Sequence, residues 1–196
     1  MEGRKMGFQQ VVKIPKDRIG VIIGKSGKVK VEIEEKCNVI IEIDSETGDT
    51  KISSEAKSLE QGVEPFKAVE IISAISKGFS PQRACRLLVG EEDTFQLIDL
   101  RDYAGKSSNS IERIKGRIIG EGGKSRRTIE ELSGAYLSVY GHTVGMIGTS
   151  EEIRLAMNAV IMLSKGSLHK KVYNMLQEAR SKAKRDRMQL WESKSF

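Results

Sequence analysis

Two glycine-bracketed turns combine residue types that suit the binding of anions. The first is Gly24-Lys25-Ser26-Gly27 and the second is Gly120-Glu121-Gly122-Gly123, and a lysine follows each turn. A turn that leads into a helix leaves the first backbone N–H groups of that helix without partners, at the positive end of its dipole. Glycines at both ends of the turn let a phosphate approach the backbone closely. The spacing therefore predicts two binding sites for the sugar-phosphate backbone of a nucleic acid.

Aliphatic and basic residues flank both turns. An isoleucine pair precedes each turn, and with Val29 and Ile33 the first pair predicts an apolar wall of base-sized width opposite a strand at 39–43. Phosphates would then be held by the turns and bases by the groove. The candidate binding residues are Ile22, Ile23, Gly24, Lys25, Ser26, Gly27, Lys28, Arg117, Ile118, Ile119, Gly120, Glu121, Gly122, Gly123, Lys124, Arg126 and Arg127.

Glu121 is the residue that fits this prediction least. It places a carboxylate where phosphates would pass, and this opposes binding electrostatically. Four cations stand close to it in the sequence, namely Arg117, Lys124, Arg126 and Arg127. We expect the second turn to bind nonetheless, with another strand path or a protein contact. The alternative is that this copy serves as a scaffold.

The two turns belong to an internal repeat with an offset of 96 residues, in which 9 of the 16 positions from Gly20 to Glu35 are identical. A match of this density indicates duplication. In the first copy we expect strands at 10–14, 39–43 and 50–53 and helices at 17–23, 28–36 and 65–77. In the second copy we expect strands at 95–100, 135–140 and 144–147 and helices at 108–119, from Lys124 and from Thr149. The order β-α-α-β-β-α, found twice, predicts an α+β fold with two three-stranded sheets backed by helices.

The repeat divides the chain into four predicted segments. These are a first domain at 1–78, an ordered helical linker at 79–94, a second domain at 95–166, and a basic C-terminal helix and tail at 167–196. The chain carries a net charge of +6, and residues 164–196 hold nine basic and three acidic side chains. We expect this helix to grip a polyanion without regard to sequence, with an affinity that falls steeply with salt.

The segment Ile19–Gly27 resembles the signature of the K-homology (KH) family, and the repeated element order is similar to its type I arrangement. This resemblance implies that each G-x-x-G loop clamps about four nucleotides of single-stranded RNA or DNA. The tandem, the linker that begins at Lys77–Pro81 and the basic helix resemble a narrower family. These are the two-KH small-subunit rRNA-processing factors of archaea and eukaryotes, of the partner-of-Nob type. The narrower resemblance implies binding near the 3′ end of the rRNA precursor, with a Nob-type endonuclease and an rRNA dimethyltransferase as candidate protein partners.

Other functional classes find little support. The three Gly-Lys-Ser triplets lack the upstream glycine of a P-loop, where Ile19, Leu100 and Ile118 stand instead. No carboxylate cluster or Cys/His spacing indicates a catalytic or metal site, so we expect a protein that is not an enzyme and has no cofactor. We also expect no membrane span, no secretion signal, a cytoplasmic location and a monomer. Two alternatives remain: a protein-interaction scaffold that docks a nuclease or other assembly factor, and a general mRNA- or single-stranded-DNA-binding KH protein.

Overall fold

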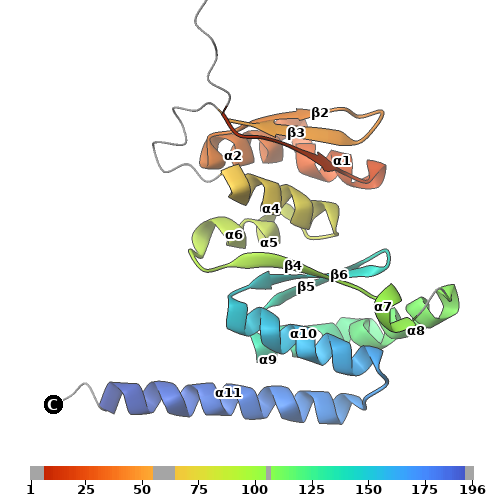
Figure 1. The fold of residues 1–196 in the computed structure, drawn as a ribbon, viewed down its shortest axis with the longest axis vertical. Coiled ribbons are helices and arrows are strands. Elements are labelled where there is room, and N and C mark those ends of the chain that lie inside the picture. The colour runs from red at the N-terminus through yellow and green to blue at the C-terminus, as the bar shows by residue number, and fades with distance from the viewer. Residues whose placement is uncertain (1–6, 55–64, 105–106, 193–196) are drawn as a thin grey trace, which may run out of the picture. The chain divides into compact units, whose positions relative to one another are not determined.

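The computed structural model describes residues 7–54, 65–104 and 107–192, and the chain separates into two compact units, residues 1–95 and 96–196. Each unit contains a three-stranded sheet with helices packed against it (Figure 1). Residues 1–6 of the predicted first domain and residues 193–196 of the predicted C-terminal tail lie outside the described residues.

The first unit follows the predicted order. Its elements are β1 (Gln9–Lys13), α1 (Lys16–Ile23), the 3-10 turn η1 (Lys25–Gly27), α2 (Lys28–Cys37), β2 (Ile40–Ile43), β3 (Asp49–Ser53) and α4 (Pro65–Ser76). The antiparallel sheet has the order β1-β3-β2, with Val12 and Ile43 both opposite Thr50. Helices α1, α2 and α4 cover one face of this sheet (Figure 1). Isoleucines such as Ile22 and Ile41, both fully buried, fill the space between the helices and the sheet.

Two short helices follow α4, namely α5 (Pro81–Ala84) and α6 (Arg86–Val89). Ser80 caps α5 by accepting a hydrogen bond from the backbone N–H of Arg83. Arg86 forms a salt bridge with the buried carboxylate of Asp93, with a 2.9 Å distance from Nε to Oδ2. Lys67 Nζ on α4 donates to the Asp93 carbonyl, which joins this segment to the first unit.

The second unit repeats the order and adds to it. Its elements are β4 (Thr94–Asp99), α7 (Arg101–Ala104), α8 (Ser108–Ile119), the 3-10 turn η2 (Glu121–Gly123), α9 (Lys124–Ser133), β5 (Tyr136–Tyr140), β6 (Thr143–Gly148), α10 (Ser150–Ser164) and α11 (His169–Glu192). The sheet order is β4-β6-β5. The predicted capping box is present, because Thr149 and Glu152 bond each other's backbone at the start of α10. The predicted α+β class is confirmed, and α7 is a helix that the sequence did not predict.

Helix α11 packs on α9 and α10, on their side away from the sheet (Figure 1). Val172 and Leu176 are fully buried on its inner face. From Ser181 to Asp186 every side chain is exposed, so the helix extends beyond the core of its own unit. Among the described helices, none is long and apolar enough to cross a lipid bilayer.

Candidate nucleic-acid interface

The first G-x-x-G loop has a backbone shape that demands glycine. Gly24 ends α1 with φ 72° and ψ 178°, a combination that residues with a side chain essentially do not adopt. A Cβ atom at this position would lie 2.4 Å from Val29 Cγ2. Ser26 and Gly27 follow with φ of 55° and 78°, both in the left-handed region, before α2 begins. The loop is closed by a hydrogen bond from Gly27 N–H to the Gly24 carbonyl.

The second loop repeats this backbone. Gly120 has φ 72° and ψ 173°, and Gly122 and Gly123 have φ of 54° and 78°. A Cβ atom on Gly120 would lie 2.7 Å from both the backbone nitrogen and the Cβ of Ser125. Because one of these atoms belongs to the helix backbone, the obstacle here is rigid. The two copies therefore share a loop conformation as well as a sequence motif.

The side chains between and after the glycines face solvent. Those of Lys25, Ser26, Lys28, Glu121, Lys124 and Arg127 are all exposed. Within the part of the chain that the structure describes, the cations of this set form no ion pair with a carboxylate. Both loops thus present free charge at the N-terminal end of a ten-residue helix, where the helix dipole favours an anion.

Arg126 adds a buried donor to the second site. Its Nε is enclosed and has no hydrogen-bond partner within the described structure, although the residue as a whole is half-buried. An enclosed guanidinium N–H without an acceptor costs free energy unless a ligand or water satisfies it. Arg126 lies three residues after Gly123, in the first turn of α9.

Two of the candidate residues are buried in this structure. Ile22 and Ile118 are both fully buried and belong to the cores of their units, and their contact with bases stays a prediction. Their neighbours Ile23 and Ile119 are half-buried and are the more accessible aliphatic side chain of each pair. The sequence could not separate the members of each pair, because both are isoleucines on adjacent positions of a helix.

Arg117 is also placed differently from the expectation. Its guanidinium donates from Nε to the Leu163 carbonyl at 3.2 Å and from Nη2 to the Ser167 carbonyl. Both acceptors belong to the end of α10 and the connection to α11. The side chain that was predicted to meet a phosphate is thus engaged inside its own domain.

A glutamate repeated in both copies was not singled out by the sequence. Glu34 Oε1 accepts from the Ile41 N–H at 2.8 Å, and Glu130 Oε1 accepts from the Leu137 N–H at 2.7 Å. Each bond ties the helix that follows the loop, α2 or α9, to the strand that comes next in the chain, β2 or β5. The signal was present, because Glu34 and Glu130 are identical positions of the repeat.

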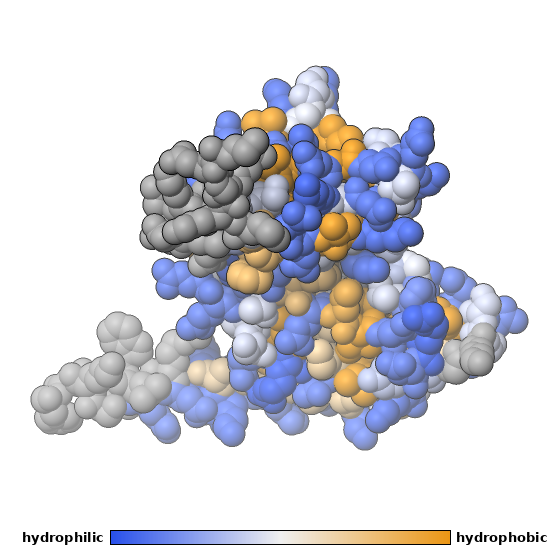
Figure 2. Space-filling model, turned by 45° about the horizontal axis from the view of Figure 1, so that its top comes forward, coloured by the Kyte–Doolittle hydropathy of each residue, from blue (hydrophilic) through white to orange (hydrophobic). Residues whose placement is uncertain are grey.

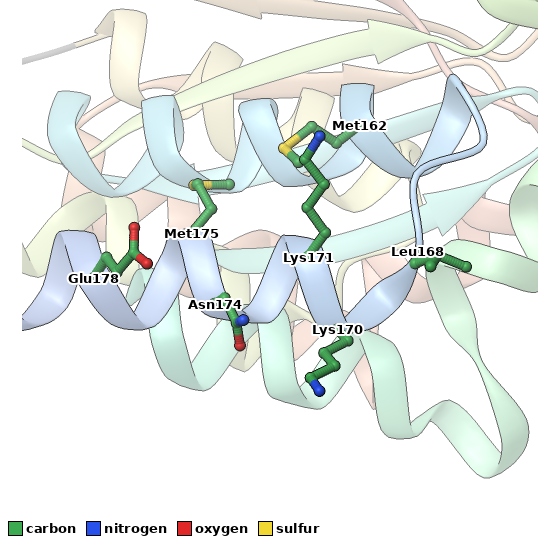
Figure 3. Close-up of a pocket in the computed structure, with 7 residues that line it drawn as sticks. All are labelled: Met162, Leu168, Lys170, Lys171, Asn174, Met175 and Glu178. Carbon is green, nitrogen blue, oxygen red and sulfur yellow. The ribbon is translucent and has the colours of Figure 1, made fainter.

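A further concave surface lies along α11, outside the two loops. A groove of about 510 Å³ lies along α11 and is lined by Met162, Leu168, Lys170, Lys171, Asn174, Met175 and Glu178. In Figure 3 the side chain of Met162 comes from α10 and that of Met175 rises from α11 toward it, while Lys170 and Asn174 point the other way. The lining contains no residue of either G-x-x-G loop and no aromatic ring for base stacking. Hydrophilic residues dominate the face shown in Figure 2.

Titratable groups with clearly shifted pKa values lie outside the loops. Hydrogen bonds from Arg101 lower the pKa of Asp99 to about 2. Burial raises the pKa of the Cys85 thiol. The described residues contain no group of three or more His, Cys, Asp and Glu side chains able to hold a metal ion. The arrangement that remains is two solvent-facing, glycine-framed loops, each followed by an exposed lysine at the start of a helix.

Comparison with known proteins agrees with this geometry. Residues 9–64 match the KH domain model, and residues 94–181 match the model described as a eukaryotic type KH-domain, type I. A KH domain-containing protein of Methanocaldococcus jannaschii is 46% identical over 186 residues, which cover 95% of this chain and 80% of that protein. The pre-rRNA-processing protein pno1 of Schizosaccharomyces pombe is 32% identical over 121 residues, 60% of this chain and 49% of that protein.

Solved structures show the same likeness. Dim2p from Pyrococcus horikoshii is 46% identical with a TM-score of 0.81, and the match covers 87% of this chain and 99% of that one. A chain in the a/eIF2alpha–aDim2p–rRNA complex from the same organism is 42% identical with a TM-score of 0.81, over 89% of this chain and 95% of that one. The structural matches therefore include both repeats.

Proposed function

The chain belongs to the tandem KH-domain family that includes the PNO1 and Dim2 pre-rRNA-processing proteins, and from this premise we propose that it binds single-stranded rRNA through both G-x-x-G loops. Its place would be small-subunit rRNA processing and ribosome assembly, near the 3′ end of the rRNA. The names of its relatives and the rRNA complex of a structural neighbour support this role.

The observation that carries the proposal is the repeated backbone of the two loops. The first glycine has φ 72° in both copies, the middle residue 55° or 54°, and the last glycine 78° in both. Glycine-framed loops of one shape, each with exposed cations and each leading into a helix, suit the repeated sugar-phosphate unit of a nucleic acid. The exposed cations beside the loops would add electrostatic attraction for phosphate groups.

Bases would be recognised along the aliphatic edge of each groove. Ile23 and Ile119 are half-buried at the start of the grooves, and aromatic residues make up 5% of the chain. Recognition by stacking platforms, as in RNA-recognition motifs, needs exposed aromatic rings. The bonds from Glu34 and Glu130 hold the helix after each loop against the next strand, so the elements on either side of the proposed base-binding surface are joined.

The distal part of α11 would add sequence-independent affinity. Its exposed cations include Lys182, Lys184 and Arg185, and the side chains around them are also exposed. Lysine and arginine on such a helix neutralise phosphates and release counterions, which raises affinity without reading bases.

Finer assignments are part of the same proposal. We infer that the protein performs no catalysis itself, acts in the cytoplasm, and works beside a Nob-type endonuclease and an rRNA dimethyltransferase. The families that match are RNA-binding KH domains, which supports a binding role over a catalytic one.

The proposal is tested by placing negative charge in each loop. Lys25→Asp with Ser26→Asp, and separately Gly122→Asp, are expected to weaken binding to a single-stranded rRNA 3′ fragment by about tenfold or more, because phosphate contacts are replaced by repulsion. Fluorescence anisotropy with labelled RNA measures the affinity, and a circular dichroism melt confirms that each variant is folded. Unchanged affinity in all of these folded variants would show that the loops do not clamp RNA.

Glu121 favours a second function for the second loop, as a docking point for a protein. A carboxylate between the glycines weakens phosphate binding but is compatible with a basic protein surface. If Gly122→Asp leaves RNA affinity unchanged while the first-loop variant lowers it, the second domain is a scaffold and the first is the RNA clamp.

A competition experiment tests whether the protein prefers rRNA. An unlabelled rRNA 3′-end fragment should displace the labelled RNA better than a scrambled RNA or a DNA of equal length does, and equal displacement would indicate a general nucleic-acid binder.

A further inference from the structure

An arginine of the first domain binds the end of that domain's last helix. Arg18 on α1 donates from Nε to the Ile75 carbonyl at 2.9 Å and from Nη2 to the Phe79 carbonyl at 2.7 Å. Between these acceptors lies Gly78, with φ 94°, where the chain turns out of α4. The side chain therefore fixes both the last turn of the helix and the segment that leaves it.

The second domain contains the same arrangement, built by a different residue. Arg117 on α8 donates to the carbonyls of Leu163 and Ser167, again four residues apart, on either side of Gly166 with φ 91°. We call these two sets of hydrogen bonds the arginine clamps. Each clamp joins the helix that runs into a G-x-x-G loop to the chain segment that follows the domain.

The two arginines are not equivalent positions of the repeat. Arg18 stands six residues before Gly24, whereas Arg117 stands three residues before Gly120, so they lie about one helical turn apart. The positions that align with them are Ile114 and Val21, which cannot form these bonds. The two domains therefore share the arrangement of hydrogen bonds but not the position of the arginine. This indicates that the link between the helix before each loop and the segment after the last helix of the domain is itself important.

The second clamp holds the start of the basic helix. His169, the first residue of α11, places its Nε2 2.9 Å from the backbone carbonyl of Arg117. The side chain of Arg117 in turn donates to the Ser167 carbonyl, two residues before His169, so α8 and the start of α11 are joined by hydrogen bonds from both of them. Lys170 and Lys171 follow directly and are exposed. Arg117 lies in the last turn of α8, three residues before Gly120, so the clamp connects the helix that runs into the second loop with the first turn of α11.

We propose that Arg117 is a positioning residue, which fixes the basic helix α11 to the second G-x-x-G loop so that one RNA strand engages both. This inference rests on the proposed RNA-binding function. A loop and a cationic helix held in one geometry act as two linked sites, and the second contact then forms at a high effective concentration. If the clamp were removed, α11 would still carry its positive charge. Its binding to the RNA strand would then include the entropic cost of fixing the helix in place, which lowers the affinity.

The test compares two RNA lengths. One RNA has about four nucleotides, the length that a single loop clamps, and the other has about five times that length, enough to reach α11 as well. Arg117→Met removes the hydrogen bonds and keeps the aliphatic packing. Binding is measured in the Lys25→Asp, Ser26→Asp background, so that the second loop dominates. Arg154→Met is the matched control, since Arg154 is an exposed arginine of α10 whose partner is Glu151 on the same helix.

The expected result is a length-dependent loss. Arg117→Met should weaken the long RNA about tenfold and the short RNA less than about twofold, while the control changes neither. Amide hydrogen exchange across His169–Arg180 should speed up in Arg117→Met alone. Equal weakening of both RNAs together with a lower salt slope would make Arg117 a direct phosphate contact and overturn the inference, as would no weakening of either.

A second variant covers the case in which Arg117→Met does not fold. His169→Phe leaves the guanidinium in place and removes the bond to the Arg117 carbonyl, and it should produce the same length-dependent loss to a smaller degree. If the chain without any substitution binds neither RNA, the proposed function fails. If it binds both and the variants show no dependence on length, the positioning role of Arg117 fails while the function stands.

Discussion

At the scale of single residues, the first glycine of each loop is the position with the least freedom. Gly24 and Gly120 combine a positive φ with an extended ψ, a region essentially restricted to glycine. At Gly120 a Cβ atom would also meet the backbone nitrogen of Ser125. At Gly122, by contrast, an added Cβ would lie in open space.

We therefore predict a clear difference between two alanine substitutions in the second loop. Gly120→Ala should lower the free energy of unfolding by about 2–4 kcal/mol, since it combines backbone strain with a rigid clash. Gly122→Ala should cost about 1 kcal/mol, because it adds only left-handed strain. Urea unfolding followed by circular dichroism measures both values. Equal costs would mean that the loop backbone is not held in the shape described.

The carboxylate of Glu121 leads to a second prediction. Glu121→Lys should raise RNA affinity several-fold and increase the slope of log affinity against log salt by roughly one, because one more phosphate is neutralised. Glu121→Gln is the control and should give a smaller gain in affinity. A loss of affinity in Glu121→Lys would show that the carboxylate itself contacts the ligand, as expected of a protein-docking or base-reading role.

At the scale of elements, helix α11 has two parts with different roles. Its first part belongs to the core, where Val172 and Leu176 are fully buried. Its second part begins at Ser181, and every side chain from Ser181 to Asp186 is exposed. A truncation after Gly166 would remove both, and would therefore confuse loss of charge with loss of folding.

The informative truncation is after Arg180. It should leave the thermal unfolding midpoint nearly unchanged, flatten the salt dependence of RNA binding, and keep the preference between rRNA and scrambled sequences, because the distal helix supplies charge but no base contact. Anisotropy titrations at several salt concentrations measure the slope. An unchanged salt dependence would show that this part of α11 does not contribute to RNA binding.

The elements also show which features local sequence can reveal. The repeat, the two loops and the order of helices and strands follow from spacing and periodicity, which are local properties. The partners of Arg117 lie 46 and 50 residues away, so only tertiary packing decides that its guanidinium turns inward. The same holds for Ile22 and Ile23, whose different burial depends on how α1 is rotated against the sheet. Short helix α7 was missed because four residues carry too little periodicity to register.

At the scale of the whole molecule, the net charge of +6 is unevenly distributed. Residues 164–196 carry nine basic and three acidic side chains, whereas the remaining sequence is close to neutral. Under the proposed function, the two domains would depend on a few cations at their loops, and general attraction to RNA would come from the C-terminal helix. Selectivity and sequence-independent affinity would then belong to different parts of one chain.

The presence of two loops in one chain gives a prediction about their combination. A variant with both loops blocked, Lys25→Asp, Ser26→Asp and Gly122→Asp, should lose more affinity for a long RNA than either single-loop variant, because tethered sites reinforce each other. Binding that remains should be weak, salt-sensitive and indifferent to sequence, as expected of α11 alone. Full affinity in this variant would place the binding site elsewhere.

The most direct test of the central claim maps RNA onto the backbone amides of the intact chain. In ¹H–¹⁵N spectra recorded during titration with a single-stranded rRNA 3′-end fragment, the amides of Gly24–Gly27 and Gly120–Gly123 and of the helix turns that follow them should shift most. This result would assign the clamp to both loops without any substitution. Shifts confined to other surfaces, with both loops unchanged at saturating RNA, would contradict the account.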